Sequence, residues 1–558
     1  MTTYEAVKRS ADRYPDYTAY DFMGTKSTYR RLLSDIDRCA SAFAALGLKK
    51  GDRVTVALPN TPHAVISFYA LNKLGAIASM IHPLSAPKEI EFYLSLSKSV
   101  WAITLDAFYG KFKEILSSTG VSRILLCRVS DYLNPLKRIG FQLTAGRKIA
   151  HVPDDPTVVW WKHLLNEPCP RVGESDLDPD ELAVILYSGG TTGRSKGVML
   201  SSMNFNCLGM QAIVQGPIAP GDSMVTVLPV FHGFGLGICV HSVLLGAAEC
   251  ILVPRFEAGS VASIIKSKRP QFIAGVPTLY EALISNHGFR HTDLSCLKGA
   301  ISGGDVLPTK VRDQIDALIR ENQGTVRIRE GYGLAETIGG CILTPRTEYR
   351  DGSVGIPMSD TMAKIVKLNT EEEAAPREDG EICIAGPTVM LGYLNNDNET
   401  ANVLKKHIDG RIWCHTGDIG RMDEDGFVYF RQRLKRMIKV SGVSVYPTQV
   451  EECLNSHPDV ALSCVIGVPD EYQIQRLKAF VVLADPSKAS PEIETKLKNH
   501  CEKNLIKWSC PKEIEFRREL PKTLVGKIAY RELEEQELRR SKMHTKPEQV
   551  KTLETATL

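Results

Sequence analysis

A glycine-rich loop at residues 188–197, with the sequence SGGTTGRSKG, constrains this chain more than any other feature. It directly follows the continuous apolar run 182–187, which is typical of a buried strand. Its four glycines let the backbone turn tightly and bring N–H groups close to a ligand. The hydroxyl side chains of the loop add further donors, and Lys196 adds a positive charge. This combination predicts a phosphate-binding loop.

The loop is not a Walker motif, because that motif has its lysine directly after a glycine and opens into a helix. Here Lys196 stands three residues after Gly193 and is followed by Gly197. Taken alone, the segment also fits a flexible glycine/serine loop with no ligand. The choice between these interpretations depends on motifs further along the chain.

Composition limits the classes of function. A chain of 558 residues exceeds a single hydrophobic core, so at least two domains are expected. With 43% hydrophobic and 24% charged residues, the chain resembles an ordinary globular protein. The net charge of +3 is too balanced to indicate a nucleic-acid partner, and none is expected.

The cysteines and the apolar segments indicate a cytoplasmic protein. The 14 cysteines form no C-x-x-C pair, and many stand in apolar runs, as expected for reduced, buried thiols. The N-terminus has no apolar signal-peptide core. The most apolar tract, 224–253, is interrupted by proline, histidine, glutamate and many glycines. We therefore expect buried strands there and no transmembrane segment.

Strand and helix patterns alternate through the first half of the chain. Residues 28–47 have the apolar spacing of an amphipathic helix, and a second helix is expected from Pro62 to Gly75. Strands are expected at 53–58, 76–81, 225–228, 250–253 and 272–276. This alternation predicts doubly wound parallel α/β sheets, in which ligands bind at the carboxyl ends of the strands.

From about residue 351 the pattern changes to short β runs separated by turns such as 378–380 and 423–426. A β-rich subdomain is therefore expected over 351–432. A basic stretch at 431–436 precedes a compact α+β pattern, with helices at 447–456 and 491–505 and strands at 460–468 and 477–483. The polar tail 541–558 is expected to be disordered.

Four further stretches suggest nucleotide chemistry. In 331–337, GYGLAET, an aromatic ring between two glycines is expected to present an open face to a planar base, with a carboxylate nearby. Asp418 stands in a turn and could accept hydrogen bonds from vicinal hydroxyls such as those of a ribose. Arg433 follows fifteen residues later, and 521–528, PKTLVGKI, places Lys527 after a glycine.

Each of these residues also has a structural explanation. Tyr332 fits a half-buried core aromatic, Asp418 a turn former, Arg433 a solvated charge and Lys527 a surface lysine. For Asp418 and Lys527 taken alone, the structural explanation is favoured. Their joint occurrence in this order favours function.

Together these motifs make the chain resemble the adenylate-forming (acyl-activating, AMP-binding) superfamily, in particular its acyl-CoA synthetase branch. The motifs YSGGTTGRSKGV, GYGLAE, TGDIG, RLK and LPKTLVGKI occur in the family's order, and the resemblance covers about 20–540. It implies an α/β N-terminal AMP-binding domain, 1–432, of two doubly wound parallel sheets plus the β-rich subdomain. It also implies a small mobile α+β C-terminal domain, 433–540, with a hinge at Lys435.

The resemblance assigns roles to individual positions. Lys527 is expected to bridge the substrate carboxylate and the α-phosphate, Glu336 to lie beside Mg²⁺, and Thr337 to contact the α-phosphate. Thr192 is the second expected metal contact. The residues expected to bind ATP or CoA are Thr191, Thr192, Gly193, Lys196, Gly303, Gly304, Asp305, Gly331, Tyr332, Gly333, Asp418, Arg433, Lys435, Lys439, Ser441 and Gly442.

The acyl pocket is expected next to two other segments. His232 is assigned a gating or carboxylate-positioning role, although a core histidine packed on Phe231 fits the sequence too. The residues expected to line the pocket are His232, Phe234, Ile338, Gly339 and Gly340. Ser441 stands where luciferases have a second lysine, which argues against a luciferase-type oxidation. The loop 440–447 is more similar to that of bacterial medium- and long-chain fatty acyl-CoA ligases.

The implied reaction is ATP-dependent activation of a carboxylic acid, medium- or long-chain fatty acids leading over aryl and branched acids. Acyl-AMP and pyrophosphate form first, and CoA then takes the acyl group. ATP, Mg²⁺ and CoA are the implied cofactors and cosubstrates, in a monomer or homodimer. Two alternatives stay open: a stand-alone enzyme that loads a carrier-protein phosphopantetheine, and an inactive nucleotide-binding protein on the same fold.

Overall fold

The computed structural model describes residues 1–173, 176–188, 195–440, 443–470, 474–523 and 528–544. The chain divides into two compact units. The first unit comprises Met1–Thr416 and Arg421–Tyr429, and the second comprises Gly417–Gly420 and Phe430–Leu558.

One sheet of the first unit has the strand order β19-β9-β8-β4-β3-β5-β6-β7. Neighbouring strands from β8 to β7 are parallel, and β9 and β19 extend the sheet with antiparallel pairing. The strands are β3 Arg53–Ala57, β4 Ile77–Met80, β5 Trp101–Leu105, β6 Arg123–Cys127, β7 Val158–Trp160, β8 Leu182–Ser188, β9 Lys196–Ser201 and β19 Gly392–Tyr393. Its helices are α1 Thr3–Arg13, α2 Tyr29–Ala45, α3 Pro62–Lys73, α4 Pro87–Ser97, α5 Tyr109–Ile115, α6 Pro135–Leu143 and α7 Trp161–Asn166.

A second sheet of the first unit has the order β16-β15-β14-β13-β12-β10-β11-β1-β2. Its central strands are parallel, and antiparallel strands close both edges. The strands are β1 Thr18–Phe22, β2 Thr25–Thr28, β10 Ser223–Thr226, β11 Glu249–Leu252, β12 Phe272–Gly275, β13 Gly299–Gly303, β14 Ile328–Tyr332, β15 Ile342–Leu343 and β16 Ile356–Pro357. Its helices are α8 Ser202–Gln215, α9 Ser242–Leu245, α10 Ala258–Lys268, α11 Pro277–Ile284, α12 His287–Arg290 and α13 Thr309–Glu321.

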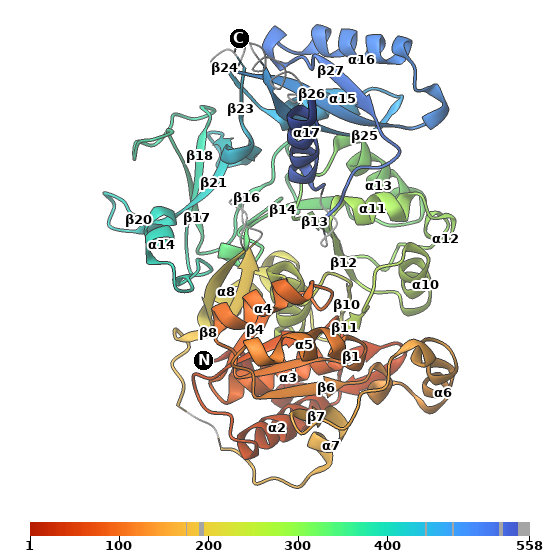
Figure 1. Ribbon diagram of the computed structural model, residues 1–558, viewed down its shortest axis with the longest axis vertical. Helices are drawn as coiled ribbons and strands as arrows, with labels where there is room; N and C mark the ends of the chain where they lie inside the picture. Colours follow the sequence, from red (N-terminus) through yellow and green to blue (C-terminus); the bar gives the residue numbers. More distant parts are fainter. Residues whose placement is uncertain (174–175, 189–194, 441–442, 471–473, 524–527, 545–558) are drawn as a thin grey trace, which may run out of the picture. The chain divides into compact units, whose positions relative to one another are not determined.

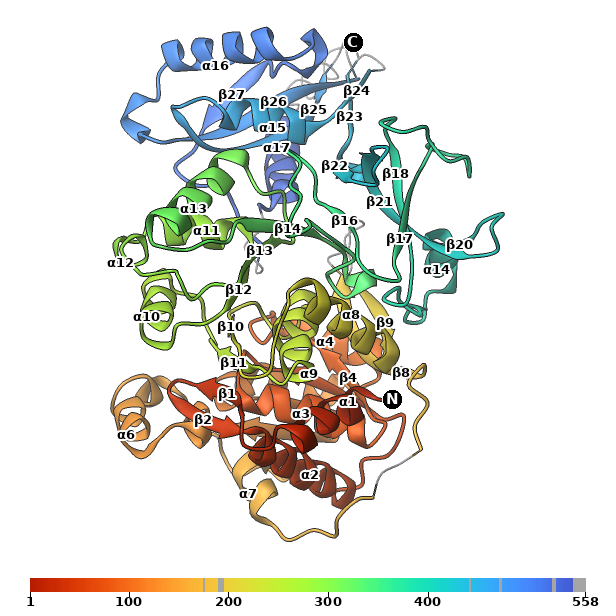
Figure 2. The same ribbon diagram turned by 180° about the vertical axis from the view of Figure 1, so that it is seen from behind.

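Both faces of this second sheet are buried, as expected for parallel strands. Val225 and Ile273 point into a core shared with α10–α13, which lie together beside the sheet in Figures 1 and 2. The adjacent residues Met224 and Phe272 point into the main core of the unit. The predicted α/β class with parallel sheets is therefore confirmed, and the antiparallel edge strands are an addition to it.

The apolar tract 224–253 differs from its predicted strands in the middle. Between β10 and β11 the chain forms a π-helix, Phe234–His241, which continues into α9. The close contacts of glycines explain why a helix fits here: a Cβ on Gly237 would lie 2.8 Å from Ile338 Cγ2. The hydroxyl of Thr226 also donates to the Cys239 carbonyl at 2.9 Å, which satisfies an acceptor that π-helical geometry leaves available.

The short β runs after residue 351 form a separate antiparallel sheet, with order β17-β18-β21-β20 and β22 paired to β21 (Figure 2). Its strands are β17 Met362–Val366, β18 Gly380–Ala385, β20 Leu404–Lys406, β21 Ile412–Met422 and β22 Val428–Arg433, and α14 Asp397–Val403 lies beside β20. The predicted turn at 423–426 joins β21 to β22.

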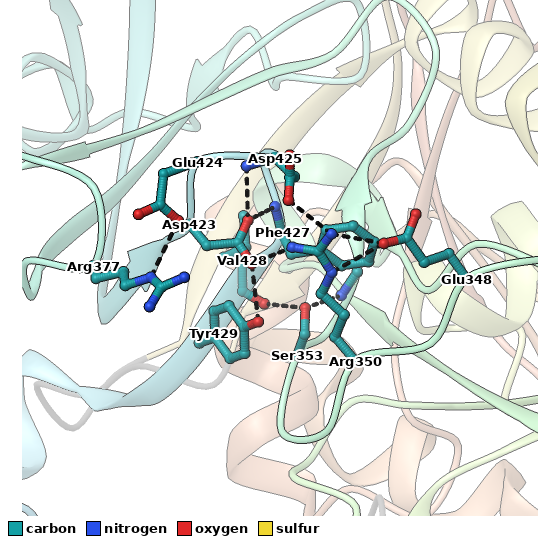
Figure 3. Close-up of polar contacts among 11 residues, drawn as sticks. Glu348, Arg350, Ser353, Arg377, Asp423, Glu424, Asp425, Phe427, Val428 and Tyr429 are labelled. Atoms are coloured by element: carbon teal, nitrogen blue, oxygen red, sulfur yellow. Dashed lines mark hydrogen bonds and ion pairs between the residues drawn. The ribbon is translucent and has the colours of Figure 1, made fainter.

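Arg350, which precedes this sheet in the sequence, binds the turn at 423–426 through its side chain (Figure 3). Its guanidinium donates to Asp423 at 2.7 Å and to Asp425 at 2.8 Å, and lies 4.0 Å from the centre of the Phe427 ring. Asp423 also accepts hydrogen bonds from the Phe427 N–H and the Tyr429 hydroxyl. Burial opposes the charge on Asp423, but these donors outweigh it and hold the pKa of its carboxyl below the usual range.

We expect Asp423→Asn to lower the melting temperature at neutral pH by a few degrees, because the Arg350 charge loses its buried partner. A carboxyl whose pKa is lower in the folded chain stabilises fully above its unfolded pKa of about 3.9 and loses that effect as pH falls through the folded value. The gap between wild type and variant should therefore shrink below about pH 4. Thermal melts across pH measure this, with Asp425→Asn, whose side chain is 68% exposed, as the control. Equal melting of Asp423→Asn and wild type at pH 7 would contradict it.

The second unit is α+β, as predicted. Its strands are β23 Ile438–Val440, β24 Val443–Val445, β25 Val460–Asp470, β26 Ile474–Leu483 and β27 Glu513–Phe516, and its helices are α15 Pro447–Asn455, α16 Pro491–Asn504 and α17 Tyr530–His544. β25 and β26 are antiparallel, whereas β26 and β27 are parallel. Because α17 reaches His544, the first four residues of the predicted disordered tail are helical, and 545–558 lie outside the described residues.

Two global expectations concern membranes and thiols. Within the described ranges, every helix is too short or too polar to cross a bilayer. Each of the 14 cysteines lies in the described part of the chain and is free. Burial raises the pKa of the Cys239 thiol to about 12, so this core cysteine stays protonated.

Candidate active site

The glycine-rich loop begins where β8 ends. Ser188, the last residue of β8, pairs with Lys196, the first residue of β9, so the loop connects two antiparallel strands and does not lead into a helix. This connection agrees with the exclusion of a Walker motif. The predicted phosphate contacts Thr191, Thr192 and Gly193 lie outside the described residues.

Lys196 forms an ion pair with Glu399, which stands in the first turn of α14. Its ammonium also lies 4.7 Å from the centre of the Tyr393 ring, within range of a cation–π interaction. The Lys196 side chain is 18% exposed, so its charge is held between these two partners and is accessible only in part.

Glu336 joins the same group of residues. It stands in the 3₁₀ turn Ala335–Thr337, and its Oε1 accepts a hydrogen bond of 2.7 Å from the Tyr393 hydroxyl. Burial and the Glu336 charge both raise the pKa of the Tyr393 phenol well above its usual range, so Tyr393 stays neutral and donates. The structure thus brings together Lys196 and Glu336, which the sequence predicted, with Tyr393 and Glu399, which it did not.

Thr337 is buried in the turn that contains Glu336. Its Oγ1 accepts from the Leu334 N–H at 3.1 Å, and its hydroxyl lies 3.3 Å from the Leu334 carbonyl. The hydroxyl therefore holds the backbone next to Glu336. The contact of Thr337 with the α-phosphate stays a prediction.

Tyr332 stands at the end of β14, where it pairs with Ile342 of β15, and the residue is 8% exposed. Its stacking near adenine stays a prediction. The glycine that follows it has a packing role. A Cβ on Gly333 would lie 2.4 Å from the Gly340 nitrogen, so Gly333 lets two chain segments pass in contact.

The predicted residues on β13 lie next to those on β14. Gly303 is in register with Gly331 across this parallel pair, so the two strands end side by side. Gly304 has a φ of +83°, which turns the chain away from the sheet. Asp305 is exposed, and its carboxylate accepts from the Val306 N–H at 2.9 Å. The predicted adenine-side segments therefore lie together at the carboxyl ends of neighbouring strands.

A small apolar cavity of about 40 Å³ lies against the second sheet, next to α8 and the π-helix. It is lined by Ala212, Gly216, Ile218, Met224, Phe234, Ile238, Phe272, Ile301, Gly303, Gly331, Gly339, Gly340, Ile342, Leu343 and Met358. Three predicted acyl-pocket residues, Phe234, Gly339 and Gly340, are in this wall. The other two differ: Ile338 is fully buried beneath the cavity residues, and His232 is half-buried outside the lining.

His232 helps to start the π-helix. Its Nδ1 accepts a hydrogen bond of 3.2 Å from the Phe234 N–H, which places the ring proton on Nε2 in the neutral form. This contact fixes the backbone at Phe234, whose side chain is in the cavity wall. This half-buried position next to the cavity wall agrees with a role near the acyl pocket.

The predicted ribose pair lies in the second unit. Asp418 is almost fully buried in β21, and its Oδ1 lies 3.2 Å from Arg433 Nε at the end of β22. Lys435 and Lys439 are exposed, in a 3₁₀ turn and in β23. Ser441, Gly442 and Lys527 lie outside the described residues.

Tyr393 and Glu399 are the residues that sequence reasoning missed. Asn396 caps the helix that contains Glu399, and an acidic residue in a first helical turn is usual without any ligand. Tyr393 follows a glycine in a short edge strand, a context with no functional signal. Only the three-dimensional proximity to Lys196 and Glu336 identifies them.

Comparison with known proteins agrees with these features. Residues 7–394 match the sequence profile of AMP-binding enzymes, and residues 449–527 match that of the AMP-binding enzyme C-terminal domain. A long-chain-fatty-acid–CoA ligase of Bacillus subtilis (strain 168) is 37% identical over 550 residues, which cover 96% of this chain and 94% of the relative. A long-chain-fatty-acid–CoA ligase of Escherichia coli O157:H7 is 34% identical over 548 residues, with coverage of 95% and 94%.

A solved structure has the same fold. ATP-bound MatB from Rhodopseudomonas palustris superposes with a TM-score of 0.83 at 24% identity, covering 96% of this chain and 99% of that one. Its large N-terminal domain and small C-terminal domain correspond to the fold class predicted from the motifs. The resemblance first noted in five short motifs extends over nearly the whole sequence, and the chain belongs to the AMP-binding enzyme family.

Proposed function

We propose that this protein is an AMP-forming ligase that activates long-chain fatty acids. The carboxylate first attacks the α-phosphorus of ATP, which gives acyl-AMP and releases pyrophosphate. The thiol of CoA then attacks the acyl carbon, which gives acyl-CoA and releases AMP and the thiol proton. The observation that carries this proposal is the apolar cavity, whose wall includes Gly339 and Gly340, directly after the turn that contains Glu336.

The lining of the cavity supports a hydrocarbon substrate. Its side chains are aliphatic, aromatic or methionine and its remaining wall is glycine. A fatty acyl chain that enters by displacing these side chains would leave no polar group unpaired. The curated relatives named above are long-chain-fatty-acid–CoA ligases over nearly their full length, which favours that substrate class over aryl acids.

Lys196 and Glu399 support a site that receives phosphates. In the absence of nucleotide, the Lys196 charge is neutralised by the Glu399 carboxylate. We infer that ATP phosphates, held also by Thr191, Thr192 and Gly193, replace or share this carboxylate partner. The carboxylate thus holds the lysine in one orientation before ATP binds, which reduces the reorganisation needed on binding.

Glu336 fits a magnesium ion that enters with ATP, because Mg²⁺ prefers carboxylate oxygens and phosphates as ligands. Bound there, Mg²⁺ would neutralise charge on the phosphates during adenylation. Thr192 is the second proposed contact. The Tyr393 hydrogen bond holds the Glu336 carboxylate in one orientation before the cation arrives.

The remaining predicted residues complete the proposal. Asp418 and Arg433, already paired, would hold the ribose, Tyr332 and the segments ending in Gly333 and Asp305 would border the adenine, and Lys527 would bridge the carboxylate and the α-phosphate. Lys435 would act as the hinge, and Lys439, Ser441 and Gly442 would serve the CoA step.

We place the reaction in the cytoplasm, because free, buried thiols are stable in that reducing compartment. Whether the enzyme is a monomer or a homodimer stays a prediction.

The test is pyrophosphate release from ATP with a panel of saturated fatty acids and aromatic acids. We expect activity that depends on the acid, highest for long chains, and acyl-CoA as the product when CoA is added. A second arm replaces CoA with a carrier protein bearing phosphopantetheine. Release of no pyrophosphate with any acid would overturn the proposal, and transfer to the carrier but not to CoA would favour the loading enzyme.

A cavity-filling change tests which space receives the acyl chain. Ala212 lies on α8 in the cavity wall, where a leucine side chain would fill the cavity. We expect Ala212→Leu to lower kcat/KM for a long-chain acid by about tenfold or more, because one misplaced methylene already costs about 1–3 kcal/mol. Activity with a short-chain acid on the same variant is the internal control and should change little. Equal losses for both acids would show that the chain binds elsewhere.

A further inference from the structure

A glutamate, a cysteine and a histidine meet on strands β18 and β21, next to the motif that contains Asp418. Glu381 and Cys383 are two residues apart on β18 and therefore share a face. His415 on β21 reaches both: its Nδ1 lies 2.7 Å from Glu381 Oε2 and 3.6 Å from Cys383 Sγ. All three ligand atoms lie within 4.8 Å of one another. Cys383 and His415 are buried, and the Glu381 side chain is 18% exposed.

A second histidine supports His415 from the opposite side of its ring. His407 Nε2 faces His415 Nε2 at 2.9 Å, so one of the two nitrogens donates a proton to the other. His407 is only 4% exposed, and its Nδ1 has no hydrogen-bond partner among the residues that the structure describes. When His415 Nδ1 donates to Glu381, His407 must donate from Nε2, and its buried Nδ1 is left as an unsatisfied acceptor.

A metal on His415 Nδ1 would reverse these roles. His415 would then hold its proton on Nε2 and donate it to His407, whose own proton would move to Nδ1. The pair keeps two protons in both states. This is the outer-shell arrangement that fixes the tautomer of metal-binding histidines, with a neutral imidazole as the acceptor.

We propose that Glu381, Cys383 and His415 bind a zinc ion, with water as the fourth ligand and His407 as the residue that orients His415. Binding would deprotonate the Cys383 thiol and release one proton. The thiolate and the carboxylate would neutralise the dication, so no net charge is buried. This proposal does not depend on the proposed ligase function.

The distances suit tetrahedral zinc. With Zn–S of about 2.3 Å and Zn–N and Zn–O of about 2.0–2.2 Å, nitrogen and sulfur ligands lie roughly 3.5 Å apart and nitrogen and oxygen roughly 3.3 Å apart. The observed Sγ–Nδ1 separation of 3.6 Å already agrees. The hydrogen-bonded Nδ1–Oε2 pair, at 2.7 Å, would have to lengthen by about half an ångström, which rotation of the partly exposed Glu381 side chain can supply.

The site would connect β18 to β21, the strand that also contains Asp418. His415 stands on β21 three residues before Asp418. A bound metal would tie β21 to β18 through side chains as well as backbone. Unlike a four-residue structural zinc site, three protein ligands leave one position open, so reversible binding is expected.

Cobalt spectroscopy of the full-length protein tests the proposal. Co²⁺ should produce a near-ultraviolet thiolate charge-transfer band that saturates at one equivalent and disappears when Zn²⁺ is added. Cys383→Ser should abolish the band, whereas Cys414→Ser, at a buried cysteine next to His415 on β21, should keep it. His407→Gln should keep the band but weaken Co²⁺ binding about 10- to 100-fold. Thermal melts without metal check that each variant is folded.

Zinc should also raise the melting temperature of wild type and Cys414→Ser but not of Cys383→Ser. A wild-type protein without the cobalt band would overturn the proposal. So would a band that persists in folded Cys383→Ser, or one that is lost equally in folded Cys414→Ser. These readouts need neither ATP nor a fatty acid, so their failure leaves the ligase proposal unaffected.

Discussion

Replacing Lys527 with alanine is expected to reduce acyl-AMP formation by about a thousandfold while leaving thioester formation from supplied acyl-AMP within a few-fold of wild type. Adenylation brings together two anions, the fatty carboxylate and the α-phosphate, and a lysine between them removes their repulsion where water is excluded. The second step starts from a neutral thiol or thiolate and a mixed anhydride, which need no such bridge. The two half-reactions are measured separately, as pyrophosphate release and as conversion of synthetic acyl-AMP and CoA to acyl-CoA.

Lys522→Ala is the matched control, because Lys522 is an exposed lysine five residues away on the same segment. It should retain both half-reactions. Equal loss of both half-reactions in Lys527→Ala would contradict the assigned role, since a residue needed throughout would be structural or would bind CoA. Unchanged adenylation would remove Lys527 from the reaction altogether and leave the ligase function itself in place.

The arrangement of the parallel sheets could be predicted from the sequence because local signals agreed with the global fold. The run 53–58 and the helix that starts at Pro62 were expected, and β3 and α3 form there. The apolar runs of β10 and β12 are buried on both faces, which is the condition that produces an unbroken hydrophobic pattern. The π-helix could not be predicted, because its apolar glycine-rich sequence lacks both periodicities.

The sequence indicated candidate site residues but not how deeply they are buried. Short motifs indicate which residues are close in the chain, and the structure places Gly303 beside Gly331 and Asp418 beside Arg433. They do not indicate burial. The interior positions of Tyr332 and Thr337 depend on β15 and on the Leu334 backbone, contacts made by the fold and not by the motif.

Contacts between residues far apart in the sequence could not be predicted for the same reason. Glu399 lies 203 residues from Lys196, and Tyr393 lies 57 residues from Glu336. Neither stands in a recognisable pattern, and each is placed by an element, α14 or β19, that the sequence did not single out. The contacts of Lys196 and Glu336 with these residues can be identified only in the folded structure.

Glu336→Gln is the second change with a large expected effect. The amide keeps the size of the side chain and can still accept from the Tyr393 hydroxyl, but it loses the negative charge proposed to bind Mg²⁺. We expect pyrophosphate release to fall about 10²- to 10³-fold, as when one preorganised electrostatic group is removed. We also expect a higher Mg²⁺ concentration for half-maximal rate, which titration of Mg²⁺ at saturating ATP and fatty acid measures.

The substitution Tyr393→Phe tests whether Glu336 acts through its charge or through the orientation that the Tyr393 hydrogen bond gives it. Phenylalanine keeps the ring beside Lys196 and the Glu336 charge but removes the 2.7 Å hydrogen bond, so the rate should fall about tenfold or less, as expected for one hydrogen bond. Its Mg²⁺ dependence should stay close to that of wild type. Glu321→Gln, an exposed glutamate at the end of α13, should change neither quantity. If Glu336→Gln retained both the wild-type rate and the wild-type Mg²⁺ dependence, its carboxylate would serve only to anchor Tyr393, and the metal would require other ligands.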